Sequence, residues 1–302
     1  MAGTMSVALV LRAPGIGELL TAVPALRALR RGGLNVVLAA PPELKDLALL
    51  TGAVEALLPT TGLDQLTWNG GRPDLAVNMH GRGPRSHRLM LELRPRRMWA
   101  FANPALPRLR GPSWHEHEHE VQRWCRLVKW YGSRVDPGEL ALPVPLCHNL
   151  APGAVVIHPG AGQAAKRWPP GRFAEVARTM VAEGLRVVVT GSGRERPMAL
   201  LVAAQGGLAP RDVLAGRTSL KELAALVAGA ALVVSADTGV AHLATAYGTP
   251  SVIVFGPGSP ARWGPPAGRP RHRALARGAD PRAVTVQDVV AAGREVRSVP
   301  VS

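Results

Sequence analysis

The sequence has only two cysteines, Cys125 and Cys147, among its 302 residues. Their spacing matches no metal or redox motif, and two ordinary thiols suit a reducing cytoplasm. Aromatic residues are also scarce, at 4% of the chain, and they do not alternate with basic residues as base-stacking side chains do. The sequence therefore favours a cytoplasmic protein and disfavours a nucleic-acid-binding one.

Long apolar runs are missing as well. No segment approaches the roughly 20 uncharged apolar residues that a membrane span requires. The start, MAGTMSVALVLRAPG, lacks the basic region and long apolar run of a signal peptide. With 47% hydrophobic side chains, the chain can instead bury a large core, and its length suits two domains of about 150 residues each.

Acidic residues are few: 21 Asp and Glu stand against 36 Lys and Arg, which gives a formal net charge of +15. Only four of the basic residues are lysines, so part of the arginine excess is a chain-wide bias. Residues 81–110 nevertheless hold eight arginines and one acid, and Arg94, Arg96 and Arg97 lie close together there. We expect this stretch to face a phosphorylated acceptor or an anionic membrane surface.

Apolar strand patterns and helical patterns alternate along most of the chain. SVALVLRAPG reads as a strand, GELLTAVPALRALRRGG as a helix and LNVVLAAPP as a second strand, which is the βαβ order of a parallel sheet. Four prolines interrupt the pattern within 134–152, and the alternation then restarts. We predict an α/β fold of two Rossmann-like doubly wound domains, 1–148 and 149–302, with a cleft between them.

A polar cluster lies between a strand pattern and a helix pattern in VVSADTGVAHLATAYGTPSVIVFGP. Asp237, Thr238 and Gly239 follow the strand, and His242 lies about one turn into the helix, which Gly248 ends. Ligands bind at this edge of an open α/β sheet, and free helix N–H groups suit a phosphate. Asp237 could also be only a helix cap.

Several segments, in order, resemble glycosyltransferase family nine, the bacterial heptosyltransferases that use ADP-heptose and adopt the two-domain GT-B fold. They are GIGELLTAVPALRALR, HEVQRWCRLVKWYG, VVIHPGAGQAAKRWPPGRFAEVA, LAGRTSLKELAALVAGAALVVSADTGVAHLATAYGTPSVIVFGP and VTVQDVV. The resemblance runs from about residue 7 to residue 292. It implies an acceptor-binding first domain and a second domain that binds the nucleotide-sugar donor.

On the donor side, the resemblance implies that the residues from Asp237 to His242 surround the diphosphate and sugar. It also places Lys166 on the donor phosphates, where its charge stabilises the leaving diphosphate; the alternative is a solvated basic loop. Gly160, in HPG, belongs to the same implied donor site. Gly191 and Glu195, in TGSGRER, resemble a loop that holds the nucleotide, where Glu195 would accept ribose hydroxyls.

On the acceptor side, the resemblance assigns catalysis to the carboxylate after GIG. Family members usually have aspartate at this position as the base that deprotonates the acceptor hydroxyl, whereas this sequence has Glu18. Its carboxylate retains the chemistry, but the extra methylene moves the oxygens by about a bond length. The alternative is that Glu18 only favours a helix amino terminus.

WHEHEHE places three histidines at alternate positions but comes with no second ligand cluster, which argues against a metal site there. The resemblance implies a GT-B enzyme, a class that generally needs no metal for transfer, so we predict no metal and no cofactor beyond the donor. The resulting hypothesis is an inverting glycosyltransferase that moves a sugar, heptose by resemblance, from an ADP-heptose-like donor to a glycan or glycolipid acceptor. It would act in the cytoplasm, with peripheral contact at the inner face of the membrane. The alternatives are a catalytically lapsed nucleotide-sugar-binding protein, a transferase with another donor sugar, and a basic nucleic-acid-binding protein.

Overall fold

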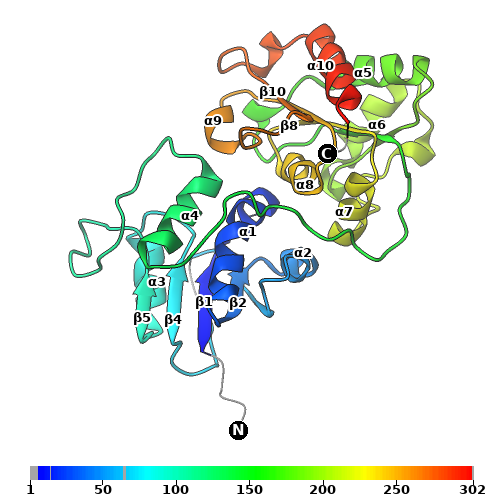
Figure 1. The fold of residues 1–302 in the computed structure, drawn as a ribbon. Coiled ribbons are helices and arrows are strands. Elements are labelled where there is room, and N and C mark those ends of the chain that lie inside the picture. The colour runs from blue at the N-terminus through cyan, green and yellow to red at the C-terminus, as the bar shows by residue number, and fades with distance from the viewer. Residues whose placement is uncertain (1–5, 14, 64–65, 301–302) are drawn as a thin grey trace. The chain divides into compact units, whose positions relative to one another are not determined.

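The computed structural model describes residues 6–13, 15–63 and 66–300. The chain divides into two compact units, Met1–Leu142 and Pro143–Ser302, so the predicted boundary after residue 148 lies a few residues beyond the observed division. Each unit is built on a parallel sheet covered by helices, which confirms the predicted α/β class (Figure 1). The predicted cleft between the domains stays a prediction.

The first unit has five parallel strands in the order β3-β2-β1-β4-β5. The strands are β1 (Val7–Leu11), β2 (Asn35–Ala40), β3 (Ala56–Pro59), β4 (Leu75–Asn78) and β5 (Arg97–Trp99). The helices are α1 (Ile16–Arg31), α2 (Lys45–Leu50), α3 (Arg85–Glu92) and α4 (Glu120–Trp130), and a short 3₁₀ turn lies at Pro42–Leu44. The central strand β1 is apolar throughout because helices cover both of its faces. Leu9 and Leu11 pack with Leu89 and Met90 of α3, and α1 packs against α4.

The second unit has the strand order β10-β9-β8-β6-β7. Its strands are β6 (Val155–His158), β7 (Val187–Val189), β8 (Leu232–Ala236), β9 (Ser251–Val254) and β10 (His272–Leu275). Its helices are α5 (Pro170–Ala182), α6 (Arg196–Gln205), α7 (Leu220–Ala228), α8 (Gly239–Tyr247), α9 (Pro260–Trp263) and α10 (Val286–Ser298). Short 3₁₀ turns lie at Ala164–Lys166, Gly193–Glu195, Pro210–Asp212 and Pro281–Ala283. Val155 and Ile157 of β6 share one apolar core with residues of α5, α6 and α10.

The arginine-rich stretch contains more regular structure than its sequence indicates. It includes α3 and the edge strand β5, neither of which the sequence pattern predicts. Leu89 and Met90 of α3 are buried while its arginines lie outside, so the apolar face is too short to stand out in the sequence. Elsewhere the expected helix end is confirmed: α8 stops at Gly248, which has the left-handed φ of 64° that favours glycine.

None of the helices in the described part of the chain combines the length and the apolar character needed to cross a membrane.

Candidate active site

Each sheet has a point at which the strand order reverses. In the first unit the chain runs outward from β1 through β2 to β3 and then returns to β4 on the other side of β1; in the second unit β6 is followed by β7, and β8 then pairs with the opposite side of β6. Doubly wound sheets bind ligands at the carboxyl ends of the strands that flank this reversal. The candidate ligand sites therefore lie at the carboxyl ends of β1 and β4 in the first unit, and at those of β6 and β8 in the second.

The loop after β8 leaves the amino terminus of α8 open. Thr238 occupies the N-cap position in an extended conformation, but its side chain makes no capping hydrogen bond. The carboxylate of Asp237 does not cap the helix either, because it pairs with Lys166. The structure thus disfavours the interpretation of these residues as simple helix caps. The first backbone N–H groups of α8 follow closely on the end of β8.

Lys166 and Asp237 meet at this edge. Lys166 ends the 3₁₀ turn after β6, and its Nζ donates a hydrogen bond of 2.7 Å to Oδ2 of Asp237. The side chain of Lys166 is only 25% exposed and that of Asp237 only 5%, so Lys166 is not the solvated loop lysine of the alternative interpretation. The backbone at Gly258 also lies close to this carboxylate, because a Cβ there would be 2.6 Å from Oδ2.

Glu195 lies directly against Gly160. Its Oε2 accepts hydrogen bonds of 2.8 Å from both the backbone N–H and the hydroxyl of Ser192, and a Cβ on Gly160 would come within 2.1 Å of its Oε1. Burial alone would raise the pKa of Glu195, but the two hydrogen bonds from Ser192 and the charge of Arg167 together lower it. Glu195 is therefore an ionised hydrogen-bond acceptor at the end of β6, close to Gly191 as well.

Two histidines border the same edge. His158 ends β6, is buried, and shares a 3.0 Å hydrogen bond between its Nδ1 and the Thr190 hydroxyl. Burial lowers its pKa against the opposing charge of Glu195, so the ring is neutral and links the ends of β6 and β7. His242, on α8, stands edge-on to Trp263, with ring centroids 6.0 Å apart.

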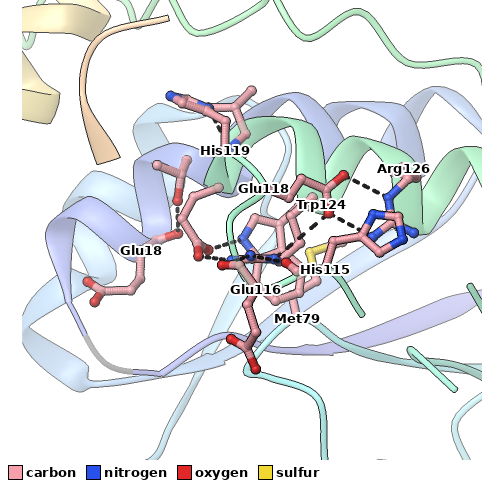
Figure 2. A network of polar contacts seen from close by, with 12 residues as sticks. Glu18, Met79, His115, Glu116, Glu118, His119, Trp124 and Arg126 are labelled. Carbon is pink, nitrogen blue, oxygen red and sulfur yellow. Dashed lines mark hydrogen bonds and ion pairs between the residues drawn. The ribbon is translucent and has the colours of Figure 1, made fainter. Parts of the chain in front are cut away.

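Glu18 lies at the reversal point of the first sheet, as Lys166 and Asp237 lie at that of the second. It lies in the first turn of α1, just after β1, and Figure 2 shows its carboxylate turned away from the polar network behind it. Its backbone oxygen accepts hydrogen bonds from Nε of Arg12, at 2.8 Å, and from the Thr21 hydroxyl, at 3.1 Å. The side chain is half-buried, so it can meet a ligand at the reversal point.

The network behind Glu18 was not anticipated from the sequence. Arg12, Glu120 and Arg123 are 3%, 2% and 0% exposed. The Glu120 carboxylate accepts hydrogen bonds from both arginines and from Nε1 of Trp124, and the Arg12 guanidinium lies 4.4 Å from the centre of the Trp124 ring. Burial, only partly offset by the nearby carboxylates, lowers the pKa of Arg12 to about 10. The local sign of this network in the sequence is Arg12, an arginine that directly follows an apolar strand.

Of the three alternating histidines, His119 uses its side chain to cap a helix, and His115 contributes its backbone carbonyl. His119 is the N-cap of α4, where its side chain accepts a hydrogen bond from the N–H of Val121, and the carbonyl of His115 accepts one from Arg123. Within the described residues there is no group of three or more histidine, cysteine or acidic side chains arranged to hold a metal ion.

Arg94, Arg96 and Arg97 lie near the edge of the first sheet at which its strands begin. Arg96 pairs with Asp74 at 3.5 Å, and Asp74 in turn accepts a hydrogen bond from the N–H of Val7, at the beginning of β1. Arg97 begins β5, and the carbonyl of Arg94 accepts a hydrogen bond from Arg72. The structure therefore separates these three arginines from Glu18, which lies beyond the carboxyl end of β1.

Comparison with known proteins identifies the family of the chain. A family model described as glycosyltransferase family 9 (heptosyltransferase) matches residues 115–288. The chain belongs to this family. Lipopolysaccharide heptosyltransferase 1 of Salmonella typhimurium is 36% identical over 153 residues, which are 48% of this chain and 47% of that protein. Its Pseudomonas aeruginosa counterpart is 40% identical over 111 residues, or 36% and 30% of the two chains.

The matched segments span less than half of the length of these curated relatives. Solved structures cover the whole fold. A family 9 glycosyltransferase from Veillonella parvula superposes with a TM-score of 0.81 at 18% identity, covering 98% of both chains. The ADP-heptose lipopolysaccharide heptosyltransferase II of E. coli gives 0.78 at 19% identity, over 97% of this chain and 98% of that one. These likenesses confirm the GT-B fold, including the first unit, most of which the family model does not match.

Proposed function

We propose that this family 9 member is an inverting glycosyltransferase that moves a heptose from an ADP-heptose-like donor to a lipopolysaccharide-type glycan or glycolipid. The observation that carries the proposal is the meeting of Lys166 and Asp237 beside the open amino terminus of α8. A nucleoside diphosphate is the ligand that such a helix end and a fixed ammonium group suit best. The relatives named for ADP-heptose and lipopolysaccharide support the choice of substrates.

On the donor side, Asp237 fixes Lys166 by one hydrogen bond, which leaves the other two N–H donors of its ammonium group for phosphate oxygens. The backbone at Thr238 and Gly239 supplies further donors, and His242 lies within the same turn of α8. Together they stabilise the negative charge that grows on the departing diphosphate. Glu195, an ionised acceptor beside Gly160 and Gly191, would bind the ribose hydroxyls of the nucleotide.

On the acceptor side, Glu18 would take the proton of the attacking hydroxyl. The oxygen then bonds to the anomeric carbon from the face opposite the diphosphate, which leaves with the electron pair of its bond, so the anomeric configuration inverts. No step requires a metal ion, since Lys166 and the end of α8 carry the positive charge. We place the enzyme in the cytoplasm, where its nucleotide-sugar donor would be made.

The test is a transfer assay with ADP-heptose and a lipopolysaccharide core oligosaccharide. The wild-type chain should release ADP and add one heptose, and NMR of the product should show the inverted anomer. Glu18→Gln should lower the rate by a factor of about 100 to 10,000 while ADP affinity, measured by calorimetry, stays nearly unchanged. Equal rates in a correctly folded Glu18→Gln variant would remove Glu18 as the base.

The remaining outcomes identify the alternatives. Tight ADP binding without transfer to any acceptor would indicate a catalytically lapsed nucleotide-sugar-binding protein, and a rise in rate in Glu18→Asp over a silent wild type would support it. Transfer from another nucleotide sugar would reassign the donor. Steeply salt-dependent, micromolar binding to arbitrary DNA would indicate a nucleic-acid-binding protein instead.

A further inference from the structure

Arg12 holds three elements of the first unit at the reversal point of its sheet. Nε donates to the carbonyl of Glu18 at 2.8 Å, and Nη1 donates to the carbonyl of Met79, just after β4, also at 2.8 Å. Nη2 lies 3.3 Å from the Thr21 hydroxyl and 3.4 Å from Oε2 of Glu120. A guanidinium group can do this because its donors point in several fixed directions, whereas lysine has a single ammonium.

Stability alone does not explain a cation at this position. Arg12 is 3% exposed and follows a fully apolar strand, and moving a charge out of water into a medium of low dielectric carries a large free-energy cost. The Glu120 carboxylate and the Trp124 ring offset part of that cost. Because well-packed apolar residues often match or exceed the stability of a buried ion pair, the arrangement calls for a reason beyond stability.

The contacts of Arg12 supply that reason. Two of them go to the carbonyl of Glu18, in the first turn of α1, and to the hydroxyl of Thr21, in the second turn, which itself donates to the Glu18 carbonyl. The first turn carries the carboxylate that faces the site, and Arg12 ties it to the end of β4 and to Glu120 of α4. A displacement of about 1 Å in a catalytic group is enough to lower a rate about 100-fold.

We infer that Arg12, anchored by Glu120, is the positioning residue for Glu18: it contacts no reacting atom and acts on the transfer only by fixing the turn that carries the base. This inference rests on the proposed role of Glu18. It predicts that the catalytic effect of a change at Arg12 depends on the presence of the Glu18 carboxylate.

A double-mutant cycle tests that dependence. Arg12→Lys keeps the charge opposite Glu120 but loses the three-way contact, and we expect it to lower kcat about 10- to 100-fold with ADP affinity unchanged. In the Glu18→Gln background, the same Arg12→Lys change should alter kcat less than about threefold. Urea unfolding should show the same loss of stability in both backgrounds, because the structural effect does not require the carboxylate.

Arg123→Lys is the matched control. Arg123 is fully buried and shares the Glu120 carboxylate, but its described hydrogen bonds otherwise go to the carbonyls of His115 and Glu116. It should destabilise the fold and leave kcat within about twofold of wild type wherever the protein is folded.

Equal losses of kcat from Arg12→Lys in both backgrounds, or no loss in either, would overturn the inference while the proposed function stands. A full rate in Glu18→Gln, or a wild-type chain without transferase activity, would overturn the proposed function and this inference with it.

Discussion

Nζ of Lys166 donates a 2.7 Å hydrogen bond to Oδ2 of Asp237, across 71 residues of sequence. The pair joins the turn after β6 to the loop after β8, on the two sides of the reversal point in the second sheet. Because Asp237 is almost completely buried, the carboxylate depends on this ammonium group for its charge balance. The pair therefore fixes both the lysine and the loop that begins α8.

Lys166→Ala removes the ammonium group from the donor site. We expect it to raise the activation barrier by about 2–4 kcal/mol, a loss of roughly 30- to 1,000-fold in kcat, because the leaving diphosphate loses a fixed positive charge. Steady-state kinetics at saturating donor measure this effect. Lys45→Ala, at an exposed lysine of α2, is the control and should have wild-type kinetics. An unchanged kcat in Lys166→Ala would return Lys166 to a purely structural role.

Gly160→Ala tests the contact with Glu195. The new Cβ would overlap the carboxylate, which can move only by breaking its two hydrogen bonds to Ser192. We expect the variant to fold and to bind ADP roughly 10-fold more weakly, a change that calorimetry resolves and that corresponds to the loss of about one good hydrogen bond. Gly162→Ala is the matched control, since a Cβ there meets nothing within 4 Å. Equal ADP affinities in the two variants would argue against a role for Glu195 in nucleotide binding.

His272 makes the stability of the fold sensitive to acid. Burial, followed by the charges of Arg269 and Arg271, lowers its pKa to about 4 from the ordinary value of 6.5. Between pH 6.5 and 4 the unfolded chain takes up a proton that the folded chain does not, so the free energy of unfolding falls as the pH is lowered through this range, by up to about 3 kcal/mol.

Urea unfolding at a series of pH values measures this dependence. His272→Gln keeps a polar partner for Ser251 and should flatten the curve between pH 6.5 and 4. His117→Gln, at an exposed histidine, should leave the curve unchanged. A His272→Gln curve as steep as that of the wild type would show that other groups control the acid sensitivity.

The arginines at the amino edge of the first sheet should matter for anionic surfaces. One of them, Arg97, lines a pocket of about 460 Å³ together with Arg134 and the stacked rings of Trp99 and Tyr131. Replacing Arg94, Arg96 and Arg97 by glutamine should weaken binding to vesicles that contain anionic lipid, most strongly at low salt, with ADP affinity unchanged.

The control for this variant removes the same charge elsewhere, by replacing the exposed Arg186, Arg211 and Arg217 of the second unit with glutamine. Vesicle sedimentation that gives equal losses for both triple variants would attribute the binding to net charge alone. A fall in ADP affinity in the first variant would place its arginines at the nucleotide site.

The sequence predicts the sheets and the donor-side loop well, because both leave local patterns. Parallel strands read as short apolar runs, and Asp237 to Gly239 follow such a run directly. The Arg12–Glu120 pair leaves no comparable pattern, since 108 residues separate its members and each looks alone like a surface charge. The edge strand β5 was missed for a different reason, namely that three residues, one of them an exposed arginine, are too few to show a period.

The hydrogen bonds from Arg12 to Glu18 and Met79 end on carbonyl oxygens, which every amino acid supplies. Evolution can therefore exchange the side chains at positions 18 and 79 without losing the contacts that place them. A change from aspartate to glutamate at position 18 alters how far the carboxylate extends, while its point of attachment stays where it was. The backbone contacts that place the first turn of α1 are therefore independent of which carboxylate the turn carries.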